Sequence, residues 1–129
     1  VPVILVADVD RGGSLASVVG TLELVGHDRE RVKGIIFNMF RGDISLFEDA
    51  VRWTEDYTGI KVVGVVPLIK GVNLPEEDSL IVVRQQKNYG EHETLTESFD
   101  IIAKTLSQCL NIDYILRLFR RVDTKPLPQ

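Results

Sequence analysis

The sequence has few cysteines, no long apolar run and no excess of basic residues, which are features of disulfide-bonded, membrane-spanning and nucleic-acid-binding proteins. It contains one cysteine in 129 residues, so no disulfide can form within the chain, and we expect a protein of the reducing cytoplasm. No apolar run approaches the ~20 residues that a membrane span requires. Lysine and arginine number 15 against 19 acidic residues, and the formal net charge of -4 argues against the basic face of a general nucleic-acid binder. We therefore expect no membrane and no nucleic acid among its partners.

Complete catalytic motifs are also absent from the sequence. It has no G-x-x-x-x-G-K-[ST] phosphate-binding loop, no G-x-S-x-G nucleophile turn and no paired C-x-x-C motifs. His27 and His92 have no partners at metal-ligand spacing, and Cys109 lies beside the apolar face of a predicted helix. These residues are interpreted as structural or solvated. The 129 residues therefore lack a recognisable complete catalytic apparatus.

Apolar runs do alternate with helical patterns through the first half of the chain. Strands rich in valine and isoleucine are predicted at residues 1–7, 33–40 and 61–67, the first of them buried on both faces. Helices are predicted between them at residues 14–26 and 43–59. Two consecutive βαβ units predict an α/β fold: a three-layer, mainly parallel sheet flanked by helices.

The pattern changes after the third predicted strand. The apolar run at 80–83 fits either a short edge strand or the start of a helix. Thr94 and Glu97 form a capping box that predicts a helix start, and a second helical pattern covers residues 112–119. The arginines that follow this pattern suit the negative end of a helix dipole and are interpreted as structural; they are Arg117, Arg120 and Arg121.

Polar segments follow each of the three predicted strands. The carboxyl ends of parallel strands meet at one edge of a sheet, where ligands bind in open α/β folds. We therefore expect the three segments to share a rim. The candidate site residues on them are Asp8, Asp10, Arg11, Gly12 and Gly13 after the first strand, Asn38 at the end of the second, and Pro67 and Leu68 at the end of the third.

The first of these segments permits two interpretations. Asp8 and Asp10 could hold a metal ion or orient a polar substrate, and Arg11 could bind a phosphate or carboxylate in fork geometry. Gly12 and Gly13 would let backbone amides approach an anion at the start of the next helix. An internal Asp–Arg pair followed by a glycine turn explains the same residues equally well.

Asn38 and the tripeptide at residues 41–43 have simpler alternatives. The Asn38 amide could offer a donor and an acceptor to the edge of a heterocycle, or it could satisfy the backbone of the following loop. Arg41, Gly42 and Asp43 spell the adhesion tripeptide, which is interpreted as a coincidence, with Asp43 acting as a helix cap. On the helix that follows, Trp53 and Tyr57 are expected to cover the sheet.

Three motifs in order resemble the cobyric acid synthase family. They are D-x-D-R-G-G at 8–13, N-x-F-R-G-D at 38–43 and G-V-V-P…L-P-E-E-D-S at 64–79, and the resemblance covers residues 1–80. It implies the C-terminal part of a P-loop NTPase domain similar to dethiobiotin synthetase. It also implies ATP and Mg²⁺ as cofactors, with their main binding elements outside this chain. The implied reaction converts carboxylates of a corrinoid, adenosylcobyrinic acid a,c-diamide, to amides with glutamine or ammonia from a glutaminase domain.

The resemblance also implies roles for the candidate residues. Asn38 would recognise adenine, and Pro67 and Leu68 would line the same base pocket. The segment from Asp8 to Gly13 would lie beside the corrinoid or phosphoryl site, with Asp8 or Asp10 near the metal and Arg11 toward a carboxylate. Residues 1–80 would form the C-terminal half of the ATP-dependent amide-ligase domain.

Residues 81–129 would then supply the closing helices and tail of that domain. This ending resembles the terminal helices of cobyrinic acid a,c-diamide synthase. Because the sequence opens at Val1 directly into a strand, we expect a piece of a longer protein. We expect this piece to be inactive alone, and a homo-oligomer is among the assemblies considered. The alternatives are a related ATP-dependent carboxylate ligase, of the diamide synthase or dethiobiotin synthetase type, and a non-catalytic partner or regulatory domain with the same fold.

Overall fold

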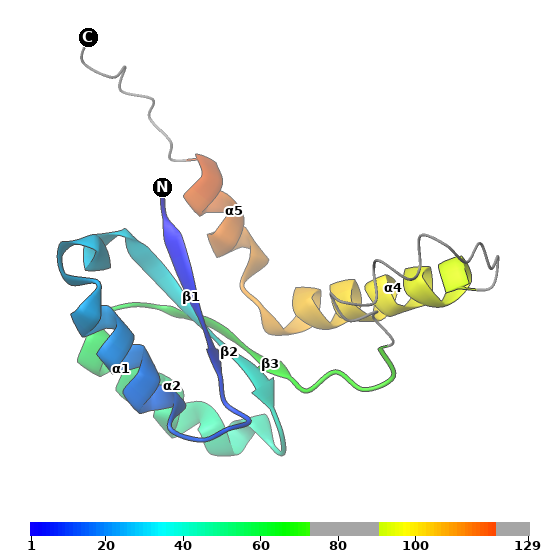
Figure 1. Ribbon diagram of the computed structural model, residues 1–129, viewed down its shortest axis with the longest axis horizontal. Helices are drawn as coiled ribbons and strands as arrows, with labels where there is room; N and C mark the ends of the chain where they lie inside the picture. Colours follow the sequence, from blue (N-terminus) through cyan, green and yellow to red (C-terminus); the bar gives the residue numbers. More distant parts are fainter. Residues whose placement is uncertain (73–90, 121–129) are drawn as a thin grey trace, which may run out of the picture. The chain divides into compact units, whose positions relative to one another are not determined.

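The computed structural model describes residues 1–72 and 91–120, which belong to two units. The first unit contains residues 1–68 and 109–129, and the second contains residues 69–108. In the first unit three parallel strands form one sheet in the order β1 (Val3–Asp8), β2 (Val32–Phe40) and β3 (Val62–Pro67) (Figure 1).

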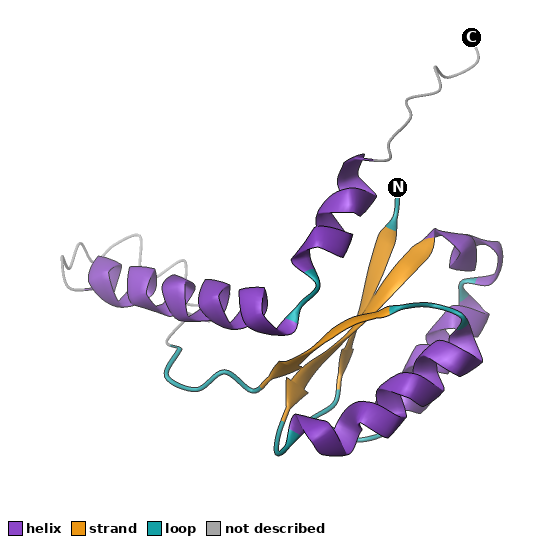
Figure 2. Ribbon diagram, turned by 180° about the vertical axis from the view of Figure 1, so that it is seen from behind, coloured by secondary structure: helices purple, strands orange, loops and turns teal. Residues whose placement is uncertain are grey.

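Helices connect the strands over one face of this sheet. Helix α1 (Ser14–Leu24) and the short 3₁₀ helix η1 (Gly26–Arg31) join β1 to β2. The 3₁₀ helix η2 (Ile44–Phe47) and α2 (Glu48–Thr58) join β2 to β3. Figures 1 and 2 show α1 and α2 on the same side of the sheet and α5 (Ile112–Arg120) on the other. The predicted α/β fold, a parallel sheet flanked by helices, is confirmed.

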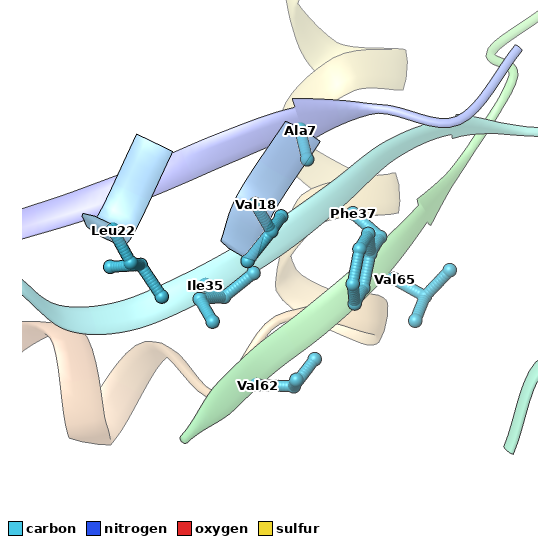
Figure 3. Close-up of a cluster of buried hydrophobic side chains, with 7 residues drawn as sticks. All are labelled: Ala7, Val18, Leu22, Ile35, Phe37, Val62 and Val65. Carbon is cyan, nitrogen blue, oxygen red and sulfur yellow. The ribbon is translucent and has the colours of Figure 1, made fainter. Parts of the chain in front are cut away.

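The core lies between the sheet and the helices α1 and α2. Ile35 and Phe37 on the central strand are both 0% exposed, because residues two apart in a strand share a face. Val18 and Leu22, four apart on α1, pack against them at 1% exposure each. Figure 3 shows this cluster, which also includes Ala7, Val62 and Val65.

The prediction that the first strand is buried on both faces is wrong. Ala7 of β1 is buried, whereas Val3 and Val6 are 43% and 57% exposed. Val6 lies on the face opposite Ala7, which α1 and α2 do not cover. Val3 shares the face of Ala7 but is the first residue of β1, which is an edge strand of the described sheet.

The chain rejoins the sheet where α5 begins. Gly64 and Leu110 form an antiparallel bridge, and the Asn111 N–H donates to the Val63 carbonyl at 2.9 Å. One turn into α5, the Tyr114 hydroxyl donates to the Lys33 carbonyl at 2.6 Å. The start of α5 is therefore fixed to both β3 and the beginning of β2.

Some predicted helix ends are confirmed and others are not. Asp43 caps η2 by accepting a hydrogen bond from the Ser45 N–H at 2.9 Å, and Gly59 ends α2 with a left-handed φ of 70°. Helix α4 spans Glu91–Cys109, so Thr94 lies inside this helix rather than at its cap. The ambiguous run at residues 80–83 lies outside the described residues.

The expectation that the aromatic pair of α2 covers the sheet is wrong. Trp53 and Tyr57 are 45% and 60% exposed, and their rings stack on each other with centroids 5.0 Å apart. Thr54 and Thr58 are the residues of α2 that are buried instead.

Among the described helices, none has both the length and the apolar character needed to cross a membrane.

Candidate functional site

The three polar segments lie at one edge of the sheet, as the strand pattern predicts. Asp8 and Asn38 are register partners across β1 and β2, and Phe40 is the partner of Pro67 across β2 and β3. Two backbone hydrogen bonds join the loops beyond the strands: Val9 N–H to the Asn38 carbonyl at 3.0 Å, and Leu68 N–H to the Phe40 carbonyl at 2.8 Å. The loops after all three strands therefore form a continuous rim.

The end of β2 has an unusual backbone conformation that makes this rim possible. Met39 has a left-handed φ of 63°, and the register with β3 shifts between Phe37 and Phe40. In a regular strand, carbonyls two residues apart point toward the same neighbour. Here the Asn38 carbonyl accepts from the loop after β1, and the Phe40 carbonyl accepts from the loop after β3. The left-handed Met39 between them turns the peptide groups that follow it toward the other side of the strand.

The side chain of Asn38 is left available by this arrangement. Its main-chain carbonyl accepts the bond from Val9, and within the described part of the chain its half-buried side-chain amide makes no hydrogen bond. The alternative interpretation, in which this amide satisfies the following loop, is therefore not what the structure shows. An amide with a free donor and a free acceptor at a sheet edge suits a planar heterocycle.

The turn after β1 is organised by Asp8 and two glycines. Asp8 Oδ1 accepts a hydrogen bond from the Asp10 N–H at 2.9 Å, which closes the turn. Gly12 and Gly13 then have φ values of 72° and 69°, a conformation that a residue with a Cβ adopts at a cost. Arg11 is 91% exposed, and its Nε lies 4.0 Å from Asp8 Oδ2. The guanidinium of Arg11 is therefore largely free for a ligand.

Asp10 has a partner that sequence reasoning missed. Both carboxylate oxygens of Asp10 accept hydrogen bonds from Arg41, Oδ1 from Nε and Oδ2 from Nη2, the latter at 3.2 Å. The hydrogen bond from Arg41 holds the pKa of Asp10 below its usual range, and Asp10 in turn raises the pKa of Arg41. This ion pair joins the loops after β1 and β2. The sequence did offer one signal for this pair: Asp10 follows β1 and Arg41 follows β2, and the ends of neighbouring parallel strands lie close together.

Two cavities border the turn and divide the candidate residues between them. A cavity of about 610 Å³ holds Asp10, Gly12 and Gly13 together with Arg41, and its apolar wall consists of Val9, Leu15, Ala16, Phe40 and Phe47. A second cavity of about 330 Å³ has Asp8 and Arg11 in its lining and shares Gly12 with the first. Asn38, Pro67 and Leu68 lie on the same rim but line neither cavity. The larger one has the volume of a small-ligand site.

The rim has few groups that could hold a metal ion. Among the described residues, no three His, Cys, Asp or Glu side chains are grouped to ligate a metal. Both oxygens of Asp10 are occupied by Arg41, whereas Asp8 is 45% exposed and uses Oδ1 for one backbone hydrogen bond. Mg²⁺ in phosphate sites is often held by only one or two carboxylates, with water and phosphate oxygens completing its shell. Asp8 fits that role and Asp10, in this conformation, does not.

Comparison with known proteins first defines the class. The model of the AAA domain family matches residues 1–76, so this chain belongs to that family of α/β domains. A comparison with solved structures found no match.

The curated relatives are cobyric acid synthases. The chain is 56% identical over 85 residues to cobyric acid synthase of Desulfitobacterium hafniense strain DSM 10664 / DCB-2, covering 65% of this chain and 16% of that protein. It is 41% identical over 128 residues to that of Vibrio vulnificus strain CMCP6, covering 97% of this chain and 25% of that protein. The chain thus spans a quarter or less of these relatives. The Vibrio match also covers the helices after residue 80, so the similarity to these relatives extends beyond the residues 1–80 that carry the sequence motifs.

Proposed function

We propose that this chain is part of a cobyric acid synthase, an ATP-dependent amidase of corrinoid carboxylates in cobalamin biosynthesis that takes nitrogen from glutamine. The observation that carries the proposal is the 41% identity to one cobyric acid synthase over 128 residues, a match that contains the whole rim, beside 56% identity to another over 85 residues. The continuous backbone linkage of the three strand-end loops supports it, because a ligase must bring nucleotide and carboxylate to one place.

Some residues of the rim would bind the nucleotide, and others would bind the substrate. The free side-chain amide of Asn38 would bond the edge of adenine, with Pro67 and Leu68 packing against the base. The left-handed Gly12 and Gly13 leave space for a phosphoryl or carboxylate oxygen to approach the start of α1. Arg11, the exposed cation of the turn, would bind the carboxylate to be activated.

Asp8 would be the carboxylate that holds Mg²⁺ at this edge. Bound Mg²⁺ supplies charge neutralisation for phosphate oxygens during phosphoryl transfer. Asp10 would act differently from Asp8, since its ion pair with Arg41 fixes the relative position of two loops. We assign Asp10 a positioning role in the site rather than contact with the metal.

Two parts of this proposal concern the protein as a whole. The nitrogen would come from glutamine or ammonia delivered by a glutaminase domain outside these residues, in a cytoplasmic enzyme. The 129 residues alone would be inactive. A different ATP-dependent carboxylate ligase would show the same ATP chemistry with another acid, and a non-catalytic domain would bind no nucleotide at all.

The test uses Asn38→Ala in the full-length protein. We expect the KM for ATP to rise roughly three- to tenfold, the value of one or two hydrogen bonds, with the KM for the corrinoid unchanged. Gln108→Ala, which removes an exposed amide on α4, is the matched control and should change neither constant. An unchanged KM for ATP in Asn38→Ala would remove the adenine assignment. ATP hydrolysis that does not depend on corrinoid and an ammonia source would remove the proposed reaction.

A further inference from the structure

A cavity of about 810 Å³ lies at the opposite end of the strands from the rim. Its lining includes Lys33, near the beginning of β2, and Lys61, the residue directly before β3. Helix α5, which Figure 1 shows beside this end of the sheet, completes the wall with Tyr114, Arg117 and Leu118, together with Asn111 directly before the helix. No residue of this cavity belongs to the rim, so its function would be separate from the chemistry proposed there.

The charge of this cavity differs from that of the chain. Four cations, Arg31, Lys33, Lys61 and Arg117, and one carboxylate, Glu30, line it, although the formal net charge of the chain is -4. Arg31 pairs with Asp28 at 3.2 Å, whereas neither lysine has a carboxylate partner within the described residues. Cations that outnumber the nearby carboxylates repel one another, and a bound anion would relieve that repulsion.

Tyr114 holds the two lysine-bearing segments in place. Its hydroxyl donates to the Lys33 carbonyl at 2.6 Å, and the Lys61 Nζ lies 5.7 Å from the centre of its ring. At the base of the helix, the Asn111 side chain accepts a hydrogen bond from the Tyr114 N–H at 3.0 Å. The cation–π contact restricts the Lys61 side chain, and the hydrogen bond to the Lys33 carbonyl fixes the backbone that carries Lys33, which lowers the entropic cost of binding.

From this arrangement we infer that the cavity binds a small organic polyanion carrying two or more phosphate or carboxylate groups. Lys33 and Lys61 would each donate to a separate anionic group, and the guanidinium of Arg117 would donate to a third oxygen or to the same group. The concave volume favours a small molecule over an extended acidic protein segment, because 300–1,000 Å³ is the range of small-molecule sites. Pro2 and Leu118 supply the apolar surface that would contact its carbon skeleton.

The test measures binding of tripolyphosphate and of citrate to the full-length protein by calorimetry at low ionic strength. We expect each of Lys33→Gln and Lys61→Gln to weaken binding of at least one probe by about tenfold, the contribution of a charge-assisted hydrogen bond. Lys104→Gln removes an exposed lysine of α4 and is the matched control for charge, with no loss expected.

Amide chemical shifts locate the bound probe independently of affinity. Shifts at Lys33, Lys61 and Tyr114 support the site, and shifts confined to residues 8–13 overturn it. Equal weakening by Lys104→Gln would mean that the anions respond only to net charge, and the inference would be wrong. It would also be wrong if neither probe bound below about 1 mM. A polyglutamate peptide that bound while both small anions failed would assign the cavity to a protein partner instead.

Discussion

Replacing Gly64 by alanine should separate α5 from the sheet. A Cβ at this position would lie 2.1 Å from the Cys109 carbonyl oxygen and 3.0 Å from Leu110 Cα. Both obstacles are backbone atoms, so no side-chain rotation can relieve them. A carbon and a carbonyl oxygen approach each other to about 3.3 Å, and the two segments would therefore have to move apart by about 1.2 Å.

The cost of this movement follows from what it breaks. The Asn111 N–H bond to the Val63 carbonyl, 2.9 Å long, belongs to the same contact and contributes about 0.5–1.5 kcal/mol. Forcing extra volume into a packed contact costs about 1–3 kcal/mol. We expect a loss of about 2–4 kcal/mol in the free energy of unfolding, or roughly 8–16 °C in Tm for a chain of this size.

The matched control is the same substitution at Gly20. This glycine lies within α1, and a Cβ there would meet nothing within 4 Å. Gly20→Ala should therefore stabilise the protein by about 0.5–1 kcal/mol, because alanine loses less chain entropy in a helix than glycine does. The same chemical change is thus expected to have opposite signs at two positions.

Thermal unfolding and amide hydrogen exchange together test this reasoning. In Gly64→Ala the Asn111 amide should exchange much faster, because its hydrogen bond is the one that opens. If Gly64→Ala unfolds within about 0.5 kcal/mol of the parent protein and Asn111 stays protected, the close approach of Cys109 to β3 is not a feature of the folded chain.

Two further predictions concern single side-chain contacts. The pKa of Asp10 is lowered by Arg41, so the stabilisation from this ion pair is fully present above the ordinary aspartate pKa of about 3.9 and is lost as the pH falls through the lower pKa of the folded state. A carbon-13 titration of the Asp10 carboxyl should show a midpoint below about 3.9 in the parent and a higher midpoint in Arg41→Gln; identical midpoints would contradict the pairing. At the start of β3, Glu55 Oε1 accepts a hydrogen bond from the Val62 N–H at 2.8 Å. Glu55→Ala should destabilise the protein by about 1–3 kcal/mol in urea unfolding, and Glu55→Gln, which keeps an acceptor oxygen, should lose less; equal losses would show that this bond contributes nothing.

Local patterns in the sequence predicted most of the regular structure. The strand expected at residues 33–40 is observed at Val32–Phe40, and the one expected at 61–67 is observed at Val62–Pro67. The caps at Asp43 and Gly59 were predictable for the same reason. Each of these features depends on neighbouring residues alone, through side-chain periodicity or the conformational freedom of a single residue.

Features that depend on distant parts of the chain were not predictable. Asp10 and Arg41 are 31 residues apart, and they meet because β1 pairs with β2 in a register that places Asp8 opposite Asn38. No local pattern specifies this register. The exposure of Trp53 likewise depends on which face of α2 meets the sheet, and the apolar residues of that helix do not form one clear stripe.

The left-handed Met39 shows how the rim and the backbone depend on each other. A non-glycine residue with positive φ costs about 1–3 kcal/mol, and nothing in the local sequence offsets that cost. The offset comes from the two hydrogen bonds that the reversal permits, one to the loop after β1 and one to the loop after β3, each contributing about 0.5–1.5 kcal/mol. A regular strand end would bond only one of these loops. Because the main chain joins both, the Asn38 side chain makes no hydrogen bond among the described residues, and this is the observation on which its proposed contact with adenine rests.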